Sequence, residues 1–149
     1  MSFYATIQGS VTYTSEIAFQ KVVNKLRELK QVNDEGMFID DGGDAVSPRK
    51  GGNCNRETLT ITVDYGCYRN LTRCFDFMFE GGEGKFVWTS IDGVFEGGVC
   101  DGTGKDTCED LDEWAKKNGW KAEDIPDEDT DERCEYQFEV EMAFHDSHS

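Results

Sequence analysis

The chain lacks several features that mark membrane, secreted and linker proteins. Its 149 residues contain no apolar run near the ~20 residues that a membrane-spanning helix needs, so we expect no membrane association. Proline occurs only twice, which is unlike a proline-rich linker. The N-terminal residues have neither the basic segment nor the apolar core of a secretory signal, and we therefore expect a cytoplasmic protein.

Metal and thiol chemistry also find little support in the pattern of cysteine and histidine. The six cysteines form no C-x-x-C pair, and their spacings fit no common zinc finger. The only two histidines lie among the last five residues, where a Cys-His nucleophile is hard to assemble. Since a cytoplasmic protein keeps its thiols reduced, we expect mostly unpaired cysteines. Pairing of Cys67 with Cys74, or of Cys100 with Cys108, is left open.

Two glycine- and acid-rich motifs come close to known ligand loops and then depart from them. The segment 98–105 resembles a phosphate-binding loop before a helix, but it is one residue too long, and Asp106 stands where Ser or Thr is needed. Asp101, Thr103 and Asp112 fit three positions of a calcium loop, but a lysine and an aspartate occupy two other critical positions. We therefore expect no cofactor and no dedicated metal site.

Hydrophobic periodicity predicts nine helices and strands along the chain. Alternation of apolar and polar residues indicates strands, and apolar residues three and four apart indicate helices. The predicted elements are a strand at 3–13, a helix at 15–31, a short strand at 36–40, a strand at 58–65, a helix at 70–79, a hairpin of strands at 85–91 and 94–99, a helix at 107–119 and a strand at 135–144. Loops are predicted at 41–55 and 121–134, and a frayed tail at 145–149.

This order, β-α-β-β-α-β-β-α-β, predicts one α+β domain over residues 1–149. Alternating strands have one apolar and one polar face, which is typical of an antiparallel sheet with helices on one side. We therefore predict a two-layer sandwich, with a possible ferredoxin-like core in its first six elements. The opposite face of the sheet would be exposed and would carry Thr, Gln and Glu side chains.

Charge is distributed very unevenly along the chain. Residues 1–75 carry nine acidic and nine basic side chains, whereas residues 76–149 carry 22 acidic and six basic ones, which accounts for the whole net charge of -16. Such a field attracts basic partners and repels nucleic acid and anionic lipid. Direct DNA or RNA binding is therefore not expected.

The candidate site is the acidic C-terminal segment, in which a loop precedes the last predicted strand. Same-face neighbours on a strand are ~6.8 Å apart, so carboxylates there would form a regular row. The candidate partner-binding residues are Glu123, Asp124, Asp127, Glu128, Asp129, Asp131, Glu132, Glu135, Glu139 and Glu141. Such a row can occupy a groove that normally holds phosphates, because both release counterions.

The sequence thus predicts a non-enzymatic inhibitor that mimics nucleic acid and blocks a basic protein, such as a nuclease or a nucleic-acid-binding complex. Phage anti-defence proteins of the anti-CRISPR type and immunity proteins against nuclease toxins are the biological classes that would fit. Three alternatives remain open: an acidic loop that only aids solubility, a small Asp/Glu-dependent metal-binding domain or enzyme, and a virion or assembly subunit.

Overall fold

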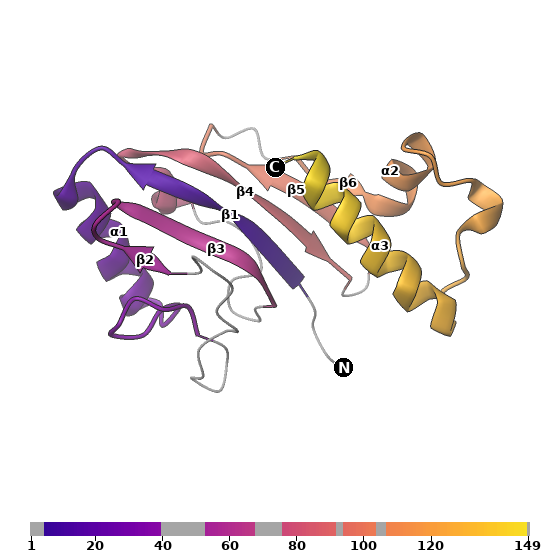
Figure 1. The fold of residues 1–149 in the computed structure, drawn as a ribbon, viewed down its shortest axis with the longest axis horizontal. Helices are drawn as coiled ribbons and strands as arrows, with labels where there is room; N and C mark the ends of the chain where they lie inside the picture. Colours follow the sequence, from indigo (N-terminus) through magenta and orange to yellow (C-terminus); the bar gives the residue numbers. More distant parts are fainter. Residues whose placement is uncertain (1–4, 40–52, 68–75, 92–93, 104–106, 149) are drawn as a thin grey trace.

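A six-stranded antiparallel sheet forms the centre of the computed structural model, which describes residues 5–39, 53–67, 76–91, 94–103 and 107–148 (Figure 1). The strands follow the order β2-β3-β1-β4-β5-β6 across the sheet. In chain order the elements are β1 (Ala5–Tyr13), α1 (Glu16–Glu28), β2 (Cys54–Asn55), β3 (Thr60–Cys67), the 3-10 helix η1 (Asp76–Phe79), β4 (Gly82–Ser90), β5 (Glu96–Cys100), β6 (Glu109–Asp110), α2 (Leu111–Lys117), the 3-10 helix η2 (Ala122–Asp124) and α3 (Asp131–Ser147).

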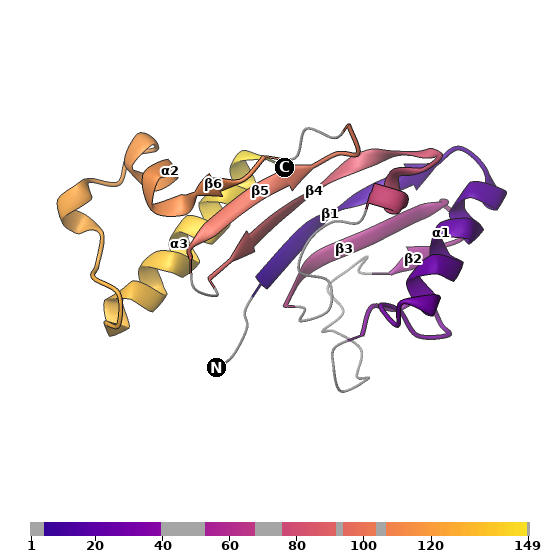
Figure 2. The ribbon, with the colours of Figure 1, turned by 180° about the vertical axis from the view of Figure 1, so that it is seen from behind.

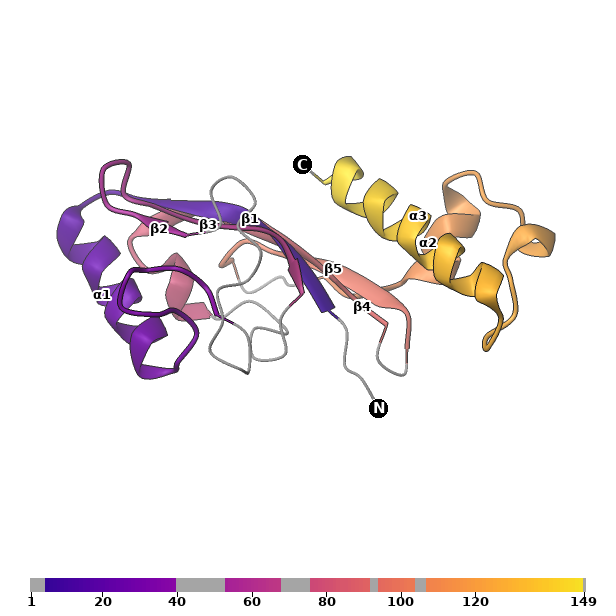
Figure 3. The same ribbon diagram turned by 60° about the horizontal axis from the view of Figure 1, so that its bottom comes forward.

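The two long helices pack on opposite faces of the sheet and at opposite ends of it. Helix α3 lies in front of the sheet in Figure 1, α1 lies in front of it in Figure 2, and Figure 3 shows one on each side. Neighbouring residues of β4 divide accordingly: Phe86 belongs to the core under α1, and Val87 belongs to the core under α2 and α3. The antiparallel α+β architecture is as predicted, but the helices do not share one face as expected. The ferredoxin-like arrangement stays a prediction.

Helix α1 follows the sequence pattern closely. The Ser15 side chain caps it by accepting a hydrogen bond from the Ala18 backbone N–H at 3.1 Å. Its buried stripe is Phe19, Val22, Val23 and Leu26, whose spacings of three and four are those of one helix face. The helix ends at Glu28, three residues before the predicted end, because Lys30 has φ 58 in the left-handed region.

Helix α2 lies within the predicted range of 107–119, but it begins four residues later and ends two residues earlier. Asp110 caps it by accepting hydrogen bonds from two backbone N–H groups, whereas the Thr107 hydroxyl accepts a bond from the Val99 N–H on β5. At the other end Gly119 has φ 109, and the Trp120 N–H donates to the Ala115 carbonyl at 3.0 Å. This bond is the Schellman closure that the glycine predicts.

The predicted helix at 70–79 and the predicted hairpin of strands at 85–91 and 94–99 can be compared with the structure only in part. Strands β4 and β5 pair antiparallel as predicted, although the Asp92-Gly93 turn lies outside the described residues. Of the predicted helix at 70–79, the part up to Phe75 is also outside them, and the rest is the 3-10 helix η1. The short strand at 36–40 appears as two isolated bridges, Val32 to Phe38 and Met37 to Asn53.

The predicted strand at 135–144 is wrong, since these residues lie within the 17-residue helix α3. The apolar residues Tyr136, Val140 and Phe144 are four apart, a spacing that is compatible with both a strand and a helix. Glu, Gln, Met and Ala dominate the intervening positions, and they favour helix. The predicted frayed tail is also wrong up to residue 148, because α3 continues to Ser147 and His145 is buried.

Cysteine pairing differs from the reduced state that we expected. Cys100 is disulfide-bonded, whereas Cys54, Cys108 and Cys134 are free thiols. The Cys108 thiol instead donates a hydrogen bond to Glu96 Oε2 at 3.4 Å. A Cys100–Cys108 bridge is therefore excluded.

Candidate functional site

The N-terminal half of α3 is anchored to α2 by a buried guanidinium. Arg133 Nη2 lies 2.9 Å from Asp112 Oδ2, and the Tyr136 hydroxyl donates to the other carboxylate oxygen at 2.7 Å. The guanidinium also lies 5.2 Å from the centre of the Tyr136 ring. Burial and, secondarily, the hydrogen bond to Asp112 raise the pKa of the Tyr136 hydroxyl above its ordinary value. Arg133 is the only Lys or Arg after Lys121, and its guanidinium is paired with Asp112.

The C-terminal half of α3 rests on a buried polar cluster between the helix and the sheet. The Thr89 hydroxyl on β4 donates to Glu141 Oε1 at 3.1 Å, and Thr6 Oγ1 on β1 lies 3.2 Å from His145 Nε2. The two threonine hydroxyls also contact each other. All four residues are at most 3% exposed. The cluster therefore joins the helix to the two central strands by polar contacts.

Burial shifts the pKa of both titratable members of this cluster in the direction that favours the neutral form. It raises the pKa of the Glu141 carboxyl to about 7, against the opposing effect of the Thr89 hydrogen bond. It also lowers the pKa of His145 to about 4, so that the ring is neutral near pH 7. Glu141 therefore does not belong to an acidic surface, and its assignment to the candidate site is wrong. The error follows from the strand prediction, which placed Glu141 beside Glu139 on an exposed face.

The other nine predicted carboxylates are exposed, and we call them the acidic surface: Glu123, Asp124, Asp127, Glu128, Asp129, Asp131, Glu132, Glu135 and Glu139. The first two lie in η2, the next three in the connection to α3, and the last four on α3 itself. Within the described part of the chain, none of them forms an ion pair with Lys, Arg or His. The acidic surface is therefore uncompensated.

Two large apolar side chains lie exposed on the same helix as these carboxylates. Phe138 is 58% exposed and Met142 is 36% exposed. They are one helical turn apart, beside Glu135 and Glu139, which are also one turn apart. The strand prediction missed this feature because it placed both apolar side chains in the core. The helix-favouring Glu, Gln, Met and Ala residues between the buried positions were the signal that could have indicated it.

The described residues show no alternative centre of metal chemistry, since no group of three or more His, Cys, Asp or Glu among them is arranged to hold an ion. At the calcium-like motif, the Thr103 N–H and hydroxyl both donate to Asp101 Oδ1, at 3.0 and 2.7 Å. That carboxylate oxygen is therefore used within the turn. In the described part of the chain, no helix has the length and apolar character needed to cross a bilayer.

Comparison with known proteins does not extend this description. No protein-family model matches the chain, and neither the curated proteins nor the solved structures include a significant match.

Proposed function

We propose that this chain is a non-enzymatic inhibitor that binds a basic, nucleic-acid-binding surface of another protein through the acidic surface and the exposed face of α3. The observation that carries the proposal is that uncompensated carboxylates and exposed apolar side chains lie together on one helix, which is anchored to α2 by Arg133. The expected binding site on the partner is a cationic groove of a nuclease or a related complex. The protein would act by occupying that groove in place of nucleic acid.

Electrostatics supports this choice of partner. Nine exposed carboxylates extend over residues 123–139, and the only cation among those residues, Arg133, is buried against Asp112. Like charges spaced i, i+4 on a helix are mildly destabilising, so Glu135 and Glu139 do not stabilise α3 by themselves. Asp131 and Glu132 in the first turn do interact favourably with the helix dipole. We therefore assign the main binding role to the residues beyond that turn.

The exposed apolar pair supports a protein partner over free cations. Phe138 and Met142 would be buried by a partner surface, and large anchors of this kind often dominate interface energetics. A surface that only improves solubility gains nothing from them. Carboxylates around the pair would steer a basic partner and make association fast and salt-sensitive.

The direct test is affinity capture from a lysate of the native host with three forms of the protein. The first is the wild type, and the second is the variant Glu135→Gln/Phe138→Ala/Glu139→Gln. The third, Glu57→Gln/Glu83→Gln, makes the same change in net charge at exposed positions outside the acidic surface. Captured proteins are identified by mass spectrometry at low salt and at ~0.5 M salt, where screening is much stronger.

We expect nucleic-acid-binding proteins to be captured by the wild type and by the third form, and to be lost from the α3 variant. Circular dichroism of each variant confirms that it is folded. Equal capture by all three folded forms would show that net charge alone attracts partners and would remove α3 from the interface.

A further inference from the structure

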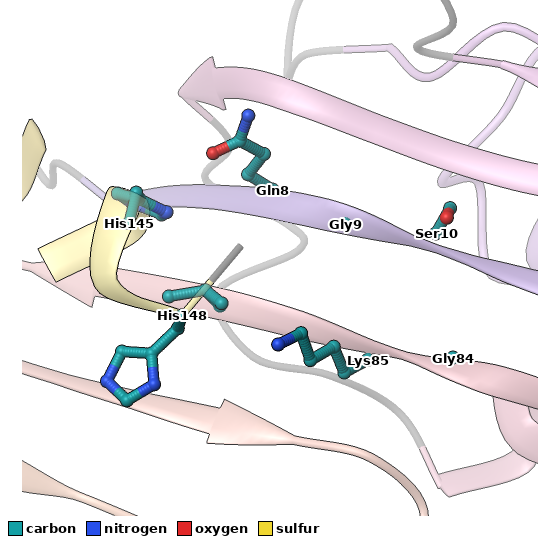
Figure 4. A pocket seen from close by; sticks show the side chains of 8 residues that line it. Gln8, Gly9, Ser10, Gly84, Lys85, His145 and His148 are labelled. Carbon is teal, nitrogen blue, oxygen red and sulfur yellow. The ribbon is translucent and has the colours of Figure 1, made fainter.

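A cavity of ≈ 330 Å³ lies beside the C-terminal turn of α3, on the face of the sheet that this helix covers only in part (Figure 4). Strand β1 contributes Gln8, Gly9 and Ser10 to it. Strand β4 contributes Gly84, Lys85 and Val87, and α3 contributes His145 and His148. Its volume is within the range typical of small-molecule sites. None of the residues that line it belongs to the acidic surface.

The lining of this cavity is unusual for a chain with a net charge of -16. It contains an ammonium, two imidazoles, a hydroxyl and an amide, but no carboxylate. Lys85 forms no ion pair with any described residue. In Figure 4 its side chain extends along β4 toward His148. An exposed cation that has no counter-ion among the described residues therefore borders the cavity.

A second donor site in the cavity is also unused. The Nε2 atom of His148 is buried and has no hydrogen-bond partner among the described residues. Its ring is held in place by an edge contact with Phe144, with ring centres 4.6 Å apart. A buried nitrogen that is left without a partner costs free energy, and a ligand oxygen would remove that cost.

The backbone under the cavity departs from regular strand geometry at Gly9. The pairing of β1 with β3 is irregular between Ile7 and Gly9, and Gly9 has φ 151. A Cβ atom at Gly9 would lie 2.1 Å from the Lys85 carbonyl oxygen, so only glycine fits there. Ser10 and Lys85 are register partners on β1 and β4, so they lie side by side in the floor of the cavity.

We propose that this cavity binds a small oxyanion, namely a molecule that carries a phosphate or carboxylate group. Lys85 supplies the countercharge, and Ser10 and His148 supply hydrogen bonds to its oxygens. The C-terminal end of a helix carries partial negative charge, which opposes an anion, so the Lys85 ammonium is needed to hold the oxyanion within reach of Ser10 and His148. Because the ligand contacts two strands and α3, its binding stabilises the docked helix. The proposal does not depend on the acidic surface.

Histidine-ring NMR provides a specific test, because the only two histidines of the chain both line the cavity. The full-length protein is titrated at constant ionic strength and pH with inorganic phosphate, with acetate and with sodium chloride. The variant Lys85→Gln removes the cation, and Lys117→Gln removes one from the exposed surface of α2 as a matched control.

We expect saturable shifts of the His148 ring signals with phosphate or acetate, but not with chloride, and the stronger of the two identifies the oxyanion. Lys85→Gln should weaken the dissociation constant about tenfold, which corresponds to ~1.4 kcal/mol, and Lys117→Gln should leave it unchanged. Absence of saturable shifts with either oxyanion would overturn the proposal. So would equal binding by folded Lys85→Gln protein, which backbone amide spectra identify.

Discussion

At the residue scale, the burial of Glu141 and His145 makes the stability of the protein depend on pH. The raised pKa of Glu141 means that the folded state holds this proton more tightly than the unfolded state. Its contribution is therefore fully present below the ordinary pKa of a glutamate and is lost as pH rises through about 7. His145 acts in the opposite direction, since its lowered pKa costs stability as pH falls from about 6.5 toward about 4.

The substitution Glu141→Gln removes the pH dependence that comes from the glutamate and leaves the one that comes from His145. It keeps a hydrogen-bond acceptor for Thr89 and removes the titration, so it should stabilise the protein more at pH 8 than at pH 5. Each pKa unit corresponds to ~1.4 kcal/mol, so the difference should be of the order of a few kcal/mol. Urea unfolding at both values of pH measures it. An equal effect of the substitution at pH 5 and pH 8 would contradict a buried, pH-sensitive carboxyl.

Arg133 provides a second prediction at the residue scale. Its side chain is 8% exposed and is paired with Asp112, which is 29% exposed. Removal of one member of a buried pair typically costs 3–5 kcal/mol, and the partial exposure of Asp112 reduces this, so we expect Arg133→Met to cost about 2–3 kcal/mol. The double variant with Asp112→Asn should recover part of that loss. Thermal unfolding of the three variants gives the coupling, and strict additivity would show that the pair is not coupled.

At the scale of elements, α1 could be predicted from the sequence and α3 could not. In α1 the cap residue and the apolar stripe agree on one structure, and the predicted helix at 15–31 lies within three residues of the observed ends. In residues 135–144 the apolar residues alternate, but Phe138 and Met142 are exposed in the structure and the buried positions are four apart. When an apolar pattern fits both a strand and a helix, helix propensity and the uncovered area of the sheet determine which one forms. The uncovered area of the sheet cannot be read from the sequence.

The same reasoning explains which parts of the candidate site could be predicted. Exposure of nine carboxylates follows from their charge and agrees with the structure, whereas their role in partner binding stays a prediction. The burial of Glu141 and the exposure of Phe138 depend on the rotation of one helix on the sheet. The cavity at Lys85 joins residues that are more than 130 positions apart in the chain, such as Ser10 and His145. Local patterns contain no such information.

Alanine substitution in α3 distinguishes the helix from the strand. On a strand, Phe138 and Phe144 would share a face and their substitutions would cost similar free energy. In the helix, Phe144 is 0% exposed and Phe138 is 58% exposed. We therefore expect Phe144→Ala to cost about 3–5 kcal/mol and Phe138→Ala less than about 0.5 kcal/mol. Chemical unfolding measures both, and similar losses for the two variants would contradict the helical arrangement.

At the scale of the whole molecule, the net charge of -16 should make stability depend on ionic strength. Self-repulsion among carboxylates without counter-ions destabilises the folded state, and salt screens it. We expect the thermal midpoint to rise between ~0.05 and ~0.5 M potassium chloride, over which the Debye length falls severalfold. The rise should be smaller when Glu132, Glu135 and Glu139 are all changed to Gln. A midpoint that is independent of salt would indicate that the acidic residues are already neutralised.

Competition with duplex DNA tests the central claim most directly. The captured partner is purified, and its complex with this protein is titrated with duplex DNA, or with chloride of the same ionic strength. Because the proposal places the acidic surface and the exposed face of α3 in the partner's nucleic-acid groove, we predict that DNA displaces the protein at concentrations where chloride alone does not. A stable ternary complex of partner, DNA and this protein would show that the two bind at different places, and it would contradict mimicry of nucleic acid.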